Sequence, residues 1–427
     1  MARYLVNPLV LFLTVWGTAL VLYAGGLCTG TFPSPQAALW AAVLLNVAGF
    51  SLGYLTWAAF QSRRRPAAPA LSYAPVLSTD KIARWLQFTG LMGLAALSLG
   101  VYRTAVIASQ LGTSLRGLLT DPGLLRAGFA MFVTAGVFET SWIVMLNSIT
   151  SALFSIGFVL LGAFLCVDSG CRKYFYLCAF LPITLATGLT SVSRYEATVN
   201  IVYMVLAYCV VRSRNGQPQE DQLSRRLERP SASRRWPLPS LGIALPLVTV
   251  AVLFFIIDIL LRKSAEYERP DRLQGFAYHL FWYLASPLAA FNEFLSTFDR
   301  HYHLGQCTFF PFYKWLSRFH LAPEADISVF GEFVVIPYVA NVYTYLRNFY
   351  EDFGMVGVVT APYLLGLAAS ALRARAGRDL PYLNLYLVLL VFILFSFYNF
   401  FLFSNQVYLQ VLFAFAFLRY RLPAWDE

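Results

Sequence analysis

The sequence predicts an all-α polytopic membrane protein with about ten transmembrane helices. Of its 427 residues, 58% are hydrophobic and only 13% are charged, whereas soluble domains carry about a quarter charged residues. Several apolar runs approach twenty residues, the length that a helix needs to cross a bilayer. Lysine and arginine gather in alternate connections between these runs. A soluble globular chain and a disordered chain are therefore both excluded.

The apolar runs place the helices in chain order. We expect transmembrane helices at 5–24, 37–60, 83–101, 141–166, 174–190, 194–212, 238–261, 354–372, 382–401 and 403–419. The first run is not expected to be a secretory signal, because no small-residue cleavage site follows it. Residues 1–212 then hold six helices, 213–237 form a polar linker, 238–261 a seventh helix, and 354–427 the last three helices with a tail.

The basic residues predict the orientation of these helices. With an N-terminus inside the cell, most of the 32 lysines and arginines fall in inside segments, and each inside loop is net positive. The positive-inside rule therefore places both termini in the cytoplasm. The net charge of +10 reports this orientation, and we expect no nucleic-acid partner. The linker at 213–237 is expected to be disordered and to touch anionic lipid.

Two outside segments are longer than simple turns. Segment 101–140 includes Ser114-Leu-Arg-Gly-Leu-Leu119, which suits a short amphipathic helix at the membrane interface. Segment 262–353 is far longer than an ordinary connection, and such loops are usually functional. Its stretch 276–298 is apolar enough to dip into the membrane and is expected to break at Pro287. We expect this long loop to form the lid of a cavity at the outer leaflet.

The long loop holds all four histidines and 22 aromatic residues between Phe276 and Tyr350. The aromatic rings suit either an interfacial belt or a sugar-binding surface. His301 and His303 resemble a metal-binding pair, but their alternating spacing would point them apart on a strand, and no third ligand is evident. The six cysteines lack metal-ligand spacing. We expect no metal and no cofactor, and we interpret the histidines as candidate proton acceptors.

Arginines at the outer side are the candidate anion-binding residues. Arg194 lies at the outer start of the sixth helix, where Ser193 and Glu196 form a capping-box pattern. Free backbone N–H groups and the helix dipole favour phosphate at such a start. Arg347 precedes the eighth helix, although Glu351 and Asp352 offer it an ordinary ion pair. Several outer guanidinium groups, with Arg272 and Arg300 among them, could together bind a pyrophosphate.

Three blocks of the outer loop resemble a known family. They are Tyr283-Leu-Ala-Ser-Pro-Leu-Ala-Ala-Phe-Asn292, Gly305-Gln-Cys-Thr-Phe-Phe310 and Asn341-Val-Tyr-Thr-Tyr-Leu-Arg-Asn-Phe-Tyr-Glu-Asp-Phe-Gly354. Together with Ser193-Arg194, their order and spacing resemble the bacterial oligosaccharide repeat-unit polymerases, the Wzy-type O-antigen and exopolysaccharide polymerases. The last block is the most specific, and the resemblance covers roughly residues 190 to 370. It implies a GT-C-like membrane fold.

The resemblance also implies a reaction. Such an enzyme moves a growing glycan from undecaprenyl-pyrophosphate to the non-reducing end of a lipid-linked repeat unit, at the periplasmic face of the bacterial inner membrane. It implies a metal-independent glycosyltransferase, with a chain-length regulator and a flippase as partners. Candidate residues follow for pyrophosphate contact (Arg194, Arg347, Arg272, Arg300), for the catalytic base (His301 or His303, then Asp352 and Glu324) and for sugar contact (Tyr283, Asn341, Tyr343, Tyr350).

Three other functions stay open at this point. One is a purely structural partner in a polysaccharide assembly complex, which would not need outer arginines. An O-antigen ligase uses the same lipid-linked donor and transfers the finished glycan to the lipid A core, and a long histidine-bearing loop suits it equally. A lipid-linked glycan flippase or other transporter would place charged residues inside its spans. Here the ionisable residues lie almost entirely at helix ends and in loops, with Asp258 as an exception.

Overall fold

The computed structural model describes residues 6–64, 79–120, 124–125, 128, 142–168, 170–190, 194–215, 272–299, 301–322, 334–336, 338–340, 342–376, 380–398 and 404–419. Helices dominate these residues. They are α2 (Pro8–Cys28), α3 (Ala37–Arg64), α4 (Thr79–Gln110), α5 (Leu115–Thr120), α7 (Trp142–Val167), α8 (Arg172–Thr190), α9 (Arg194–Asn215), α12 (Arg272–Thr297), α13 (Phe310–Arg318), α14 (Leu346–Arg375), α15 (Leu380–Phe395) and α16 (Asn405–Arg419).

The all-α membrane class is confirmed at this level. Six helices, α2, α3, α4, α7, α9 and α14, are long and apolar enough to cross a bilayer, and α15 and α16 are apolar but shorter. The expected helix at 238–261 and the linker at 213–237 lie outside the described residues, apart from the end of α9. In the described parts of the chain, only β1 (Val334–Ile336) and β2 (Tyr338–Ala340) are strands. They pair antiparallel, with Val335 opposite Val339.

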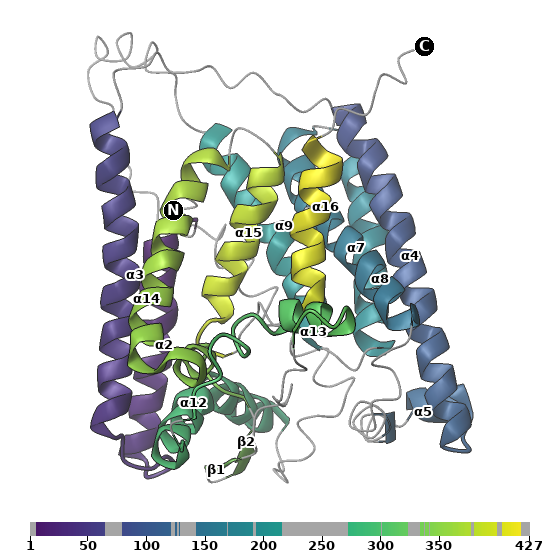
Figure 1. The fold of residues 1–427 in the computed structure, drawn as a ribbon. Coiled ribbons are helices and arrows are strands. Elements are labelled where there is room, and N and C mark those ends of the chain that lie inside the picture. The colour runs from purple at the N-terminus through teal and green to yellow at the C-terminus, as the bar shows by residue number, and fades with distance from the viewer. Residues whose placement is uncertain are drawn as a thin grey trace.

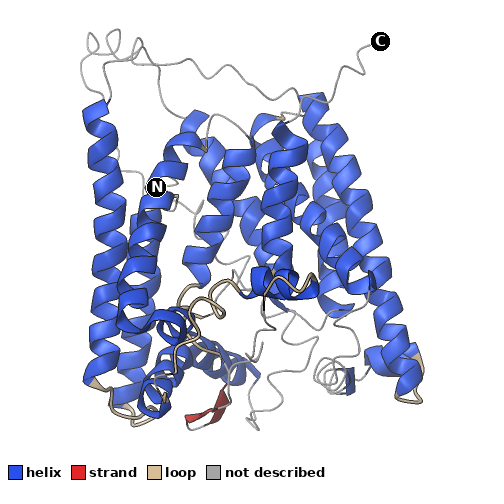
Figure 2. Cartoon of the chain, viewed as in Figure 1, coloured by secondary structure: helices blue, strands red, loops and turns tan. Residues whose placement is uncertain are grey.

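The long helices stand side by side along one axis, and the remaining elements gather at one end of them (Figures 1 and 2). α5, α12 and the β1–β2 hairpin lie at that end, together with the connection between α2 and α3. α12 is held there by polar contacts: the Asn292 side chain accepts a hydrogen bond from the Gln36 backbone N–H at 2.8 Å and donates one to the Ser34 carbonyl at 3.3 Å. We call this the loop end of the bundle.

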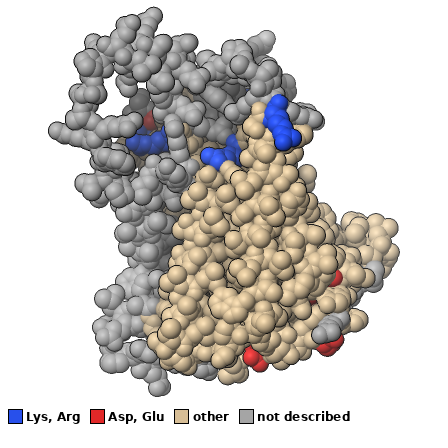
Figure 3. Space-filling view, turned by 90° about the vertical axis from the view of Figure 1, so that its left-hand side faces the viewer, with Lys and Arg blue, Asp and Glu red and all other residues tan. Residues whose placement is uncertain are grey.

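On one face of the bundle, the described charged side chains avoid the middle of the surface. On the face shown in Figure 3, Lys and Arg lie toward the upper end, Asp and Glu lie mainly toward the lower end, and the broad band between them carries neither. The upper end is opposite the loop end and holds Arg63, Arg172, Lys173, Arg373 and Arg375, at the ends of α3, α8 and α14. An uncharged band between polar ends is what a bilayer requires of the surface that faces it.

Glycines let α3 and α14 pack closely. A Cβ atom added to Gly53 would lie 1.9 Å from the carbonyl oxygen of Tyr363, and one added to Gly366 would lie 2.2 Å from that of Phe50. Only hydrogen fits at such distances, so the two backbones touch as in other small-residue interfaces of membrane helices. This contact fixes α14, which carries Arg347 at its loop end, against a long membrane-crossing helix.

The helices differ from the predicted ones in several places; α15, for example, ends at Phe395 and not near residue 401. α4 runs on to Gln110 instead of ending near residue 101. α14 begins at Leu346 but is interrupted by the non-helical residue Gly354, so its long segment starts where the eighth helix was predicted to start, and a short helical segment that was not predicted precedes it. The expected break at Pro287 is also wrong, because α12 continues through that proline from Arg272 to Thr297. The short helix expected near residues 114–119 is confirmed as α5.

Candidate functional site

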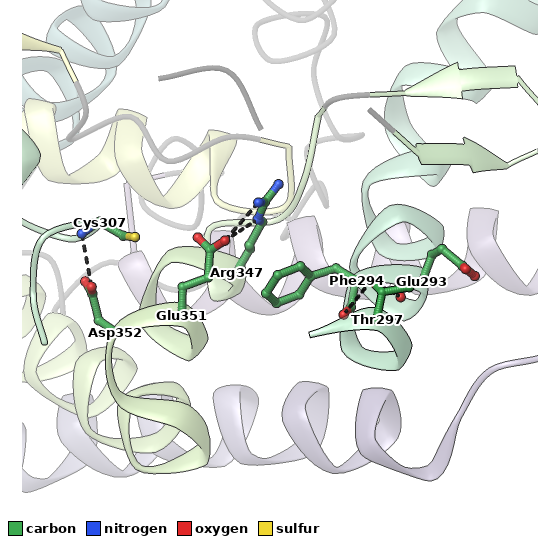
Figure 4. Close-up of polar contacts among 7 residues, drawn as sticks. All are labelled: Glu293, Phe294, Thr297, Cys307, Arg347, Glu351 and Asp352. Atoms are coloured by element: carbon green, nitrogen blue, oxygen red, sulfur yellow. Dashed lines mark hydrogen bonds and ion pairs between the residues drawn. The ribbon is translucent and has the colours of Figure 1, made fainter. Parts of the chain in front are cut away.

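Arg347 is buried at the loop end of the bundle, in the first turn of α14. Its side chain carries a positive charge, yet the residue is only 8% exposed. The Nε and Nη2 groups both donate hydrogen bonds to Oε1 of Glu351, at 2.9 and 2.8 Å (Figure 4). The two residues are four apart on one helix, the spacing at which side chains meet. The ion pair that the sequence offered Arg347 is therefore present.

Two aromatic rings enclose the guanidinium group. Its Cζ atom lies 4.1 Å from the ring centroid of Tyr343 and 4.8 Å from that of Phe294. Cations are attracted to the faces of aromatic rings at such distances, and more so where water is excluded. Tyr343, expected to contact sugar, is buried with its ring against Arg347. Phe294, which the sequence did not single out, comes from α12 and completes the enclosure.

One nitrogen of the buried guanidinium is not used. In the described parts of the chain, Nη1 of Arg347 has no hydrogen-bond partner, although it is shielded from solvent. Figure 4 shows this end of the side chain turned away from Glu351. A buried donor without an acceptor costs about 1–3 kcal/mol, and more when it is charged. An anionic oxygen bound at Nη1 would remove that penalty, so the arrangement suits binding of a negatively charged group.

Asp352 anchors the preceding loop to α14. Its carboxylate is fully buried and accepts a hydrogen bond from the Cys307 amide at 3.0 Å (Figure 4). It also accepts one from the Thr308 amide at 2.6 Å. Each carboxylate oxygen thus already accepts a hydrogen bond from a backbone N–H group. The geometry favours an anchoring role for Asp352 over the expected role of catalytic base.

Gly354 bends α14 just after these residues. Its φ of 60° and ψ of −148° are not helical, and this combination is almost restricted to glycine. The Tyr302 ring lies directly against it: a Cβ atom on Gly354 would be 3.1 Å from the Tyr302 hydroxyl oxygen. After the bend the chain passes close to the first segment, because a Cβ on Gly357 would lie 2.3 Å from the Phe349 carbonyl oxygen. The bend sets the angle of the segment that carries Arg347 and Glu351.

The two central histidines lie beside this segment. The His303 backbone N–H donates to the Glu351 carbonyl at 3.0 Å, and the His301 N–H donates to the Asp299 carboxylate at 2.9 Å. The expectation that their rings point apart is wrong: the ring centroids are 5.6 Å apart. The segment is not a strand, and Leu304 adopts a positive φ of 50° right after it. His301 is exposed and His303 is half-buried.

The other expected residues divide into those placed elsewhere and those not described. Tyr350 packs against Phe291, Phe294 and Phe298 next to the Arg347 enclosure. Tyr283 lies further along α12, with its ring 5.5 Å from that of Tyr398. Arg194 and Arg272 begin α9 and α12, as the sequence suggested for Arg194, but their side chains lie outside the described residues. Arg300, Glu324 and Asn341 also lie outside them.

Metal binding finds no support among the described side chains. They contain no group of three or more histidine, cysteine or acidic residues placed to hold a metal ion. The cysteines that the structure describes are all free thiols: Cys28, Cys166, Cys171, Cys178, Cys209 and Cys307. The cluster formed by Arg347, Glu351, Tyr343 and Phe294, next to the His301–Thr308 loop, is the candidate site for an anionic group.

Comparison with known proteins does not place the chain in a family. No family model matches the sequence, no curated protein is significantly similar to it, and no solved structure matches its fold.

Proposed function

We propose that this protein is a glycan polymerase that uses a donor linked to a lipid pyrophosphate. The observation that carries the proposal is the buried Arg347, which aromatic rings enclose at the loop end of a membrane bundle and whose Nη1 has no hydrogen-bond partner among the described residues. This N–H group of Arg347 could bind a pyrophosphate oxygen at the membrane surface. The block from Asn341 to Gly354 also resembles the repeat-unit polymerases.

The reaction needs negative charge to be stabilised on a leaving group. A hydroxyl oxygen of the acceptor sugar attacks the anomeric carbon of the donor glycan, and the bond from that carbon to the pyrophosphate oxygen breaks. The charge that develops on the departing pyrophosphate is met by the fixed guanidinium of Arg347, which is already oriented by Glu351. The proton of the acceptor hydroxyl passes to a base, for which we propose His303 or His301.

The membrane setting belongs to the same proposal. With the basic end of the bundle in the cytoplasm, both termini are cytoplasmic and the loop end faces the periplasm. Donor and acceptor are then undecaprenyl-pyrophosphate-linked oligosaccharides in the inner membrane, and a flippase and a chain-length regulator are the expected partners. Tyr350, which packs on Phe294 beside the enclosed arginine, is our candidate for sugar contact.

Two rivals make different predictions. An O-antigen ligase would use the same pyrophosphate donor and the same arginine, but its acceptor is the lipid A core. A transporter would use charged groups within its spans. Among the described residues, Arg103 of α4 and Glu196 of α9 interact electrostatically near the loop end, and the groups that link helices deeper in the bundle are neutral, such as Ser155 and Asn200 at 2.8 Å. Neutral links of this kind favour an enzyme over an ion-coupled transporter.

Gene deletion in the native host separates these functions. Loss of a polymerase leaves lipid core that carries a single repeat unit, loss of a ligase leaves bare core, and loss of a flippase leaves repeat units on their carrier inside the cell. We expect single repeats on gels of surface glycan, restored to a ladder by the wild-type gene. Normal chain lengths in the deletion strain would refute the polymerase.

Site-directed variants then test the site. Arg347→Ala and Arg194→Ala should fail to restore the ladder at normal protein levels. Arg375→Ala is the matched control, since Arg375 also lies over an aromatic ring, at 5.7 Å from that of Tyr382, but at the opposite end of α14. A full ladder from Arg347→Ala would show that the pyrophosphate binds elsewhere.

A further inference from the structure

A nine-residue helix next to the candidate site exposes an apolar stripe. α13 spans Phe310–Arg318, and Phe309, Phe312, Leu316 and Phe319 follow one another at spacings of three and four, which puts them on one helix face. These four residues are 48%, 42%, 41% and 73% exposed. Contiguous exposed apolar surface of this kind marks a contact with a partner or a membrane.

The position of α13 identifies which of these applies. Phe312 packs edge-to-face on Tyr408 of α16, with ring centroids 4.8 Å apart, so α13 lies across the end of a bundle helix. Figure 1 shows that α3 and α4 continue beyond this level toward the loop end, and that the β1–β2 hairpin lies further out still. The stripe is therefore exposed at a depth that the apolar surfaces of longer helices also occupy.

The composition of α13 fits the boundary between lipid and water. The helix combines aromatic residues with a cation, and Nζ of Lys314 lies 5.9 Å from the ring centroid of Phe310. Helices that lie in the membrane interface combine an apolar face with basic residues on the other side, and aromatic side chains prefer that zone. Trp315 and Tyr313 are half-buried beside the stripe.

We propose that α13 is an interfacial helix whose stripe, formed by Phe309, Phe312, Leu316 and Phe319, inserts into the phospholipid of the outer bilayer boundary. The occupant of this surface is the bilayer itself, because the stripe continues the apolar surface of the spans. If the stripe instead contacted a second copy of the chain, protein crosslinks would form. If it faced water, the yield of lipid adducts would be low.

The interfacial helix also determines the depth of the candidate site relative to the bilayer. This part of the inference rests on the proposed function. The residues just before α13 are tied to α14 by the two amide hydrogen bonds to Asp352. A helix fixed at the lipid boundary therefore holds Arg347 near the headgroups. The pyrophosphate of a lipid-linked substrate lies at that same level, so the substrate can reach the site while its isoprenoid tail stays in the bilayer.

Photo-crosslinking tests the placement of α13. p-Benzoylphenylalanine is introduced by amber suppression in place of Phe319 or Leu316 in the full chain, and the protein is reconstituted in vesicles of phosphatidylethanolamine and phosphatidylglycerol. Leu412 of α16, 59% exposed, is the lipid-facing reference. Val335 of β1, 72% exposed and also apolar, is the matched control on the outer hairpin. Adducts are identified by mass spectrometry after irradiation.

We expect phospholipid adducts at positions 319 and 316 in yields comparable with position 412 and several-fold above position 335. Adducts to a second copy of the chain, adducts within the chain, or yields as low as at position 335 would each overturn the proposal. Phe319 is replaced by another aromatic residue, so we expect the variant to fold normally. Gel filtration checks this. Because this measurement involves no glycan substrate, its failure is distinct from failure of the proposed function.

Discussion

Arg347 is the residue on which the proposed chemistry most depends. Lysine keeps its charge but cannot bind Glu351 through two nitrogens while it presents a third to a substrate. We therefore predict that Arg347→Lys loses chain extension almost as fully as Arg347→Ala, by roughly 100-fold or more, the usual effect of removing one fixed donor to a developing anion. Initial rates of extension measure this, with Arg375→Lys as the control. Near-normal extension by Arg347→Lys would contradict a directional role for the guanidinium.

Glu351 orients Arg347 but also repels an incoming anion. Glu351→Gln keeps the shape of the side chain and removes its charge. We predict slower turnover, since the guanidinium is held less firmly, together with tighter inhibition by inorganic pyrophosphate. A change of about fivefold in the inhibition constant corresponds to ~1 kcal/mol, the interaction between unit charges about 4 Å apart in water. Weaker pyrophosphate inhibition in this variant would argue that Glu351 itself contributes to anion binding.

Cys307 reports on the anchor that Asp352 provides. Burial, and then the nearby carboxylates of Glu351 and Asp352, raise the pKa of the Cys307 thiol. The reactive thiolate is therefore scarce at neutral pH, and we predict that Cys307 resists maleimide in the wild-type protein. Asp352→Asn removes one negative charge and weakens the loop contacts, and both changes raise the alkylation rate, by at least about tenfold if the pKa falls by one unit.

Peptide mapping of alkylated protein checks this prediction. Asp299→Asn is the matched control, since Asp299 is exposed and caps only the His301 amide. The anchoring role fails if Cys307 reacts equally in the wild type and in Asp352→Asn.

Sequence reasoning found part of this site, for identifiable reasons. The outer position of Arg347 and its spacing to Glu351 could be predicted, because both depend only on residues close together in the sequence. The aromatic enclosure of Arg347 could not be predicted, because Phe294 belongs to α12 and no sequence pattern around it indicates this contact. Tyr343 was read as a sugar contact because its partner in space was unknown. His301 and His303 were assigned opposite directions on the assumption of a strand, which the turn at Leu304 does not allow.

At the scale of elements, the bend at Gly354 decides how α14 presents its first turns. A methyl group there would meet the Tyr302 ring and would have to adopt a strongly disfavoured backbone conformation. We predict that Gly354→Ala destabilises the protein by about 1–3 kcal/mol and abolishes extension, as Arg347 is displaced. Thermal unfolding in detergent and the extension assay measure the two effects.

Gly17→Ala is the control for this substitution. Gly17 lies within α2 and has open space at its Cβ position, so alanine there should leave stability unchanged or slightly raised. If Gly354→Ala behaves like Gly17→Ala, the bend is not required.

The helix boundaries show what hydropathy can and cannot locate. The middle of α14 was predicted because its residues are apolar. Its start at Leu346 was missed because Arg347, Glu351 and Asp352 are polar, and they are satisfied by contacts that only the folded chain supplies. α12 runs through Pro287 because the residues around it are packed on all sides, and such burial overrides a local breaker. The hydropathy of a short sequence window contains no information on these tertiary contacts or on burial.

At the scale of the whole molecule, two native cysteines test the orientation without engineering. Cys28 is exposed where α2 ends at the loop end, and Cys171 is exposed beside Arg172 at the opposite end. If the basic end is cytoplasmic, a membrane-impermeant maleimide should label Cys28 in spheroplasts and Cys171 only in inverted vesicles. The reverse pattern would place Arg347 on the cytoplasmic side and would contradict the proposed periplasmic site.

The central claim is that the fixed, buried guanidinium of Arg347 serves a polymerase. The most direct measurement uses the purified protein in liposomes with synthetic undecaprenyl-pyrophosphate-linked repeat units and EDTA. We predict a ladder of products that differ by whole repeat units, one undecaprenyl pyrophosphate released per unit added, and neither from Arg347→Ala. Repeat units that stay unextended with the wild-type protein, or equal ladders from the wild type and Arg347→Ala, would contradict the account.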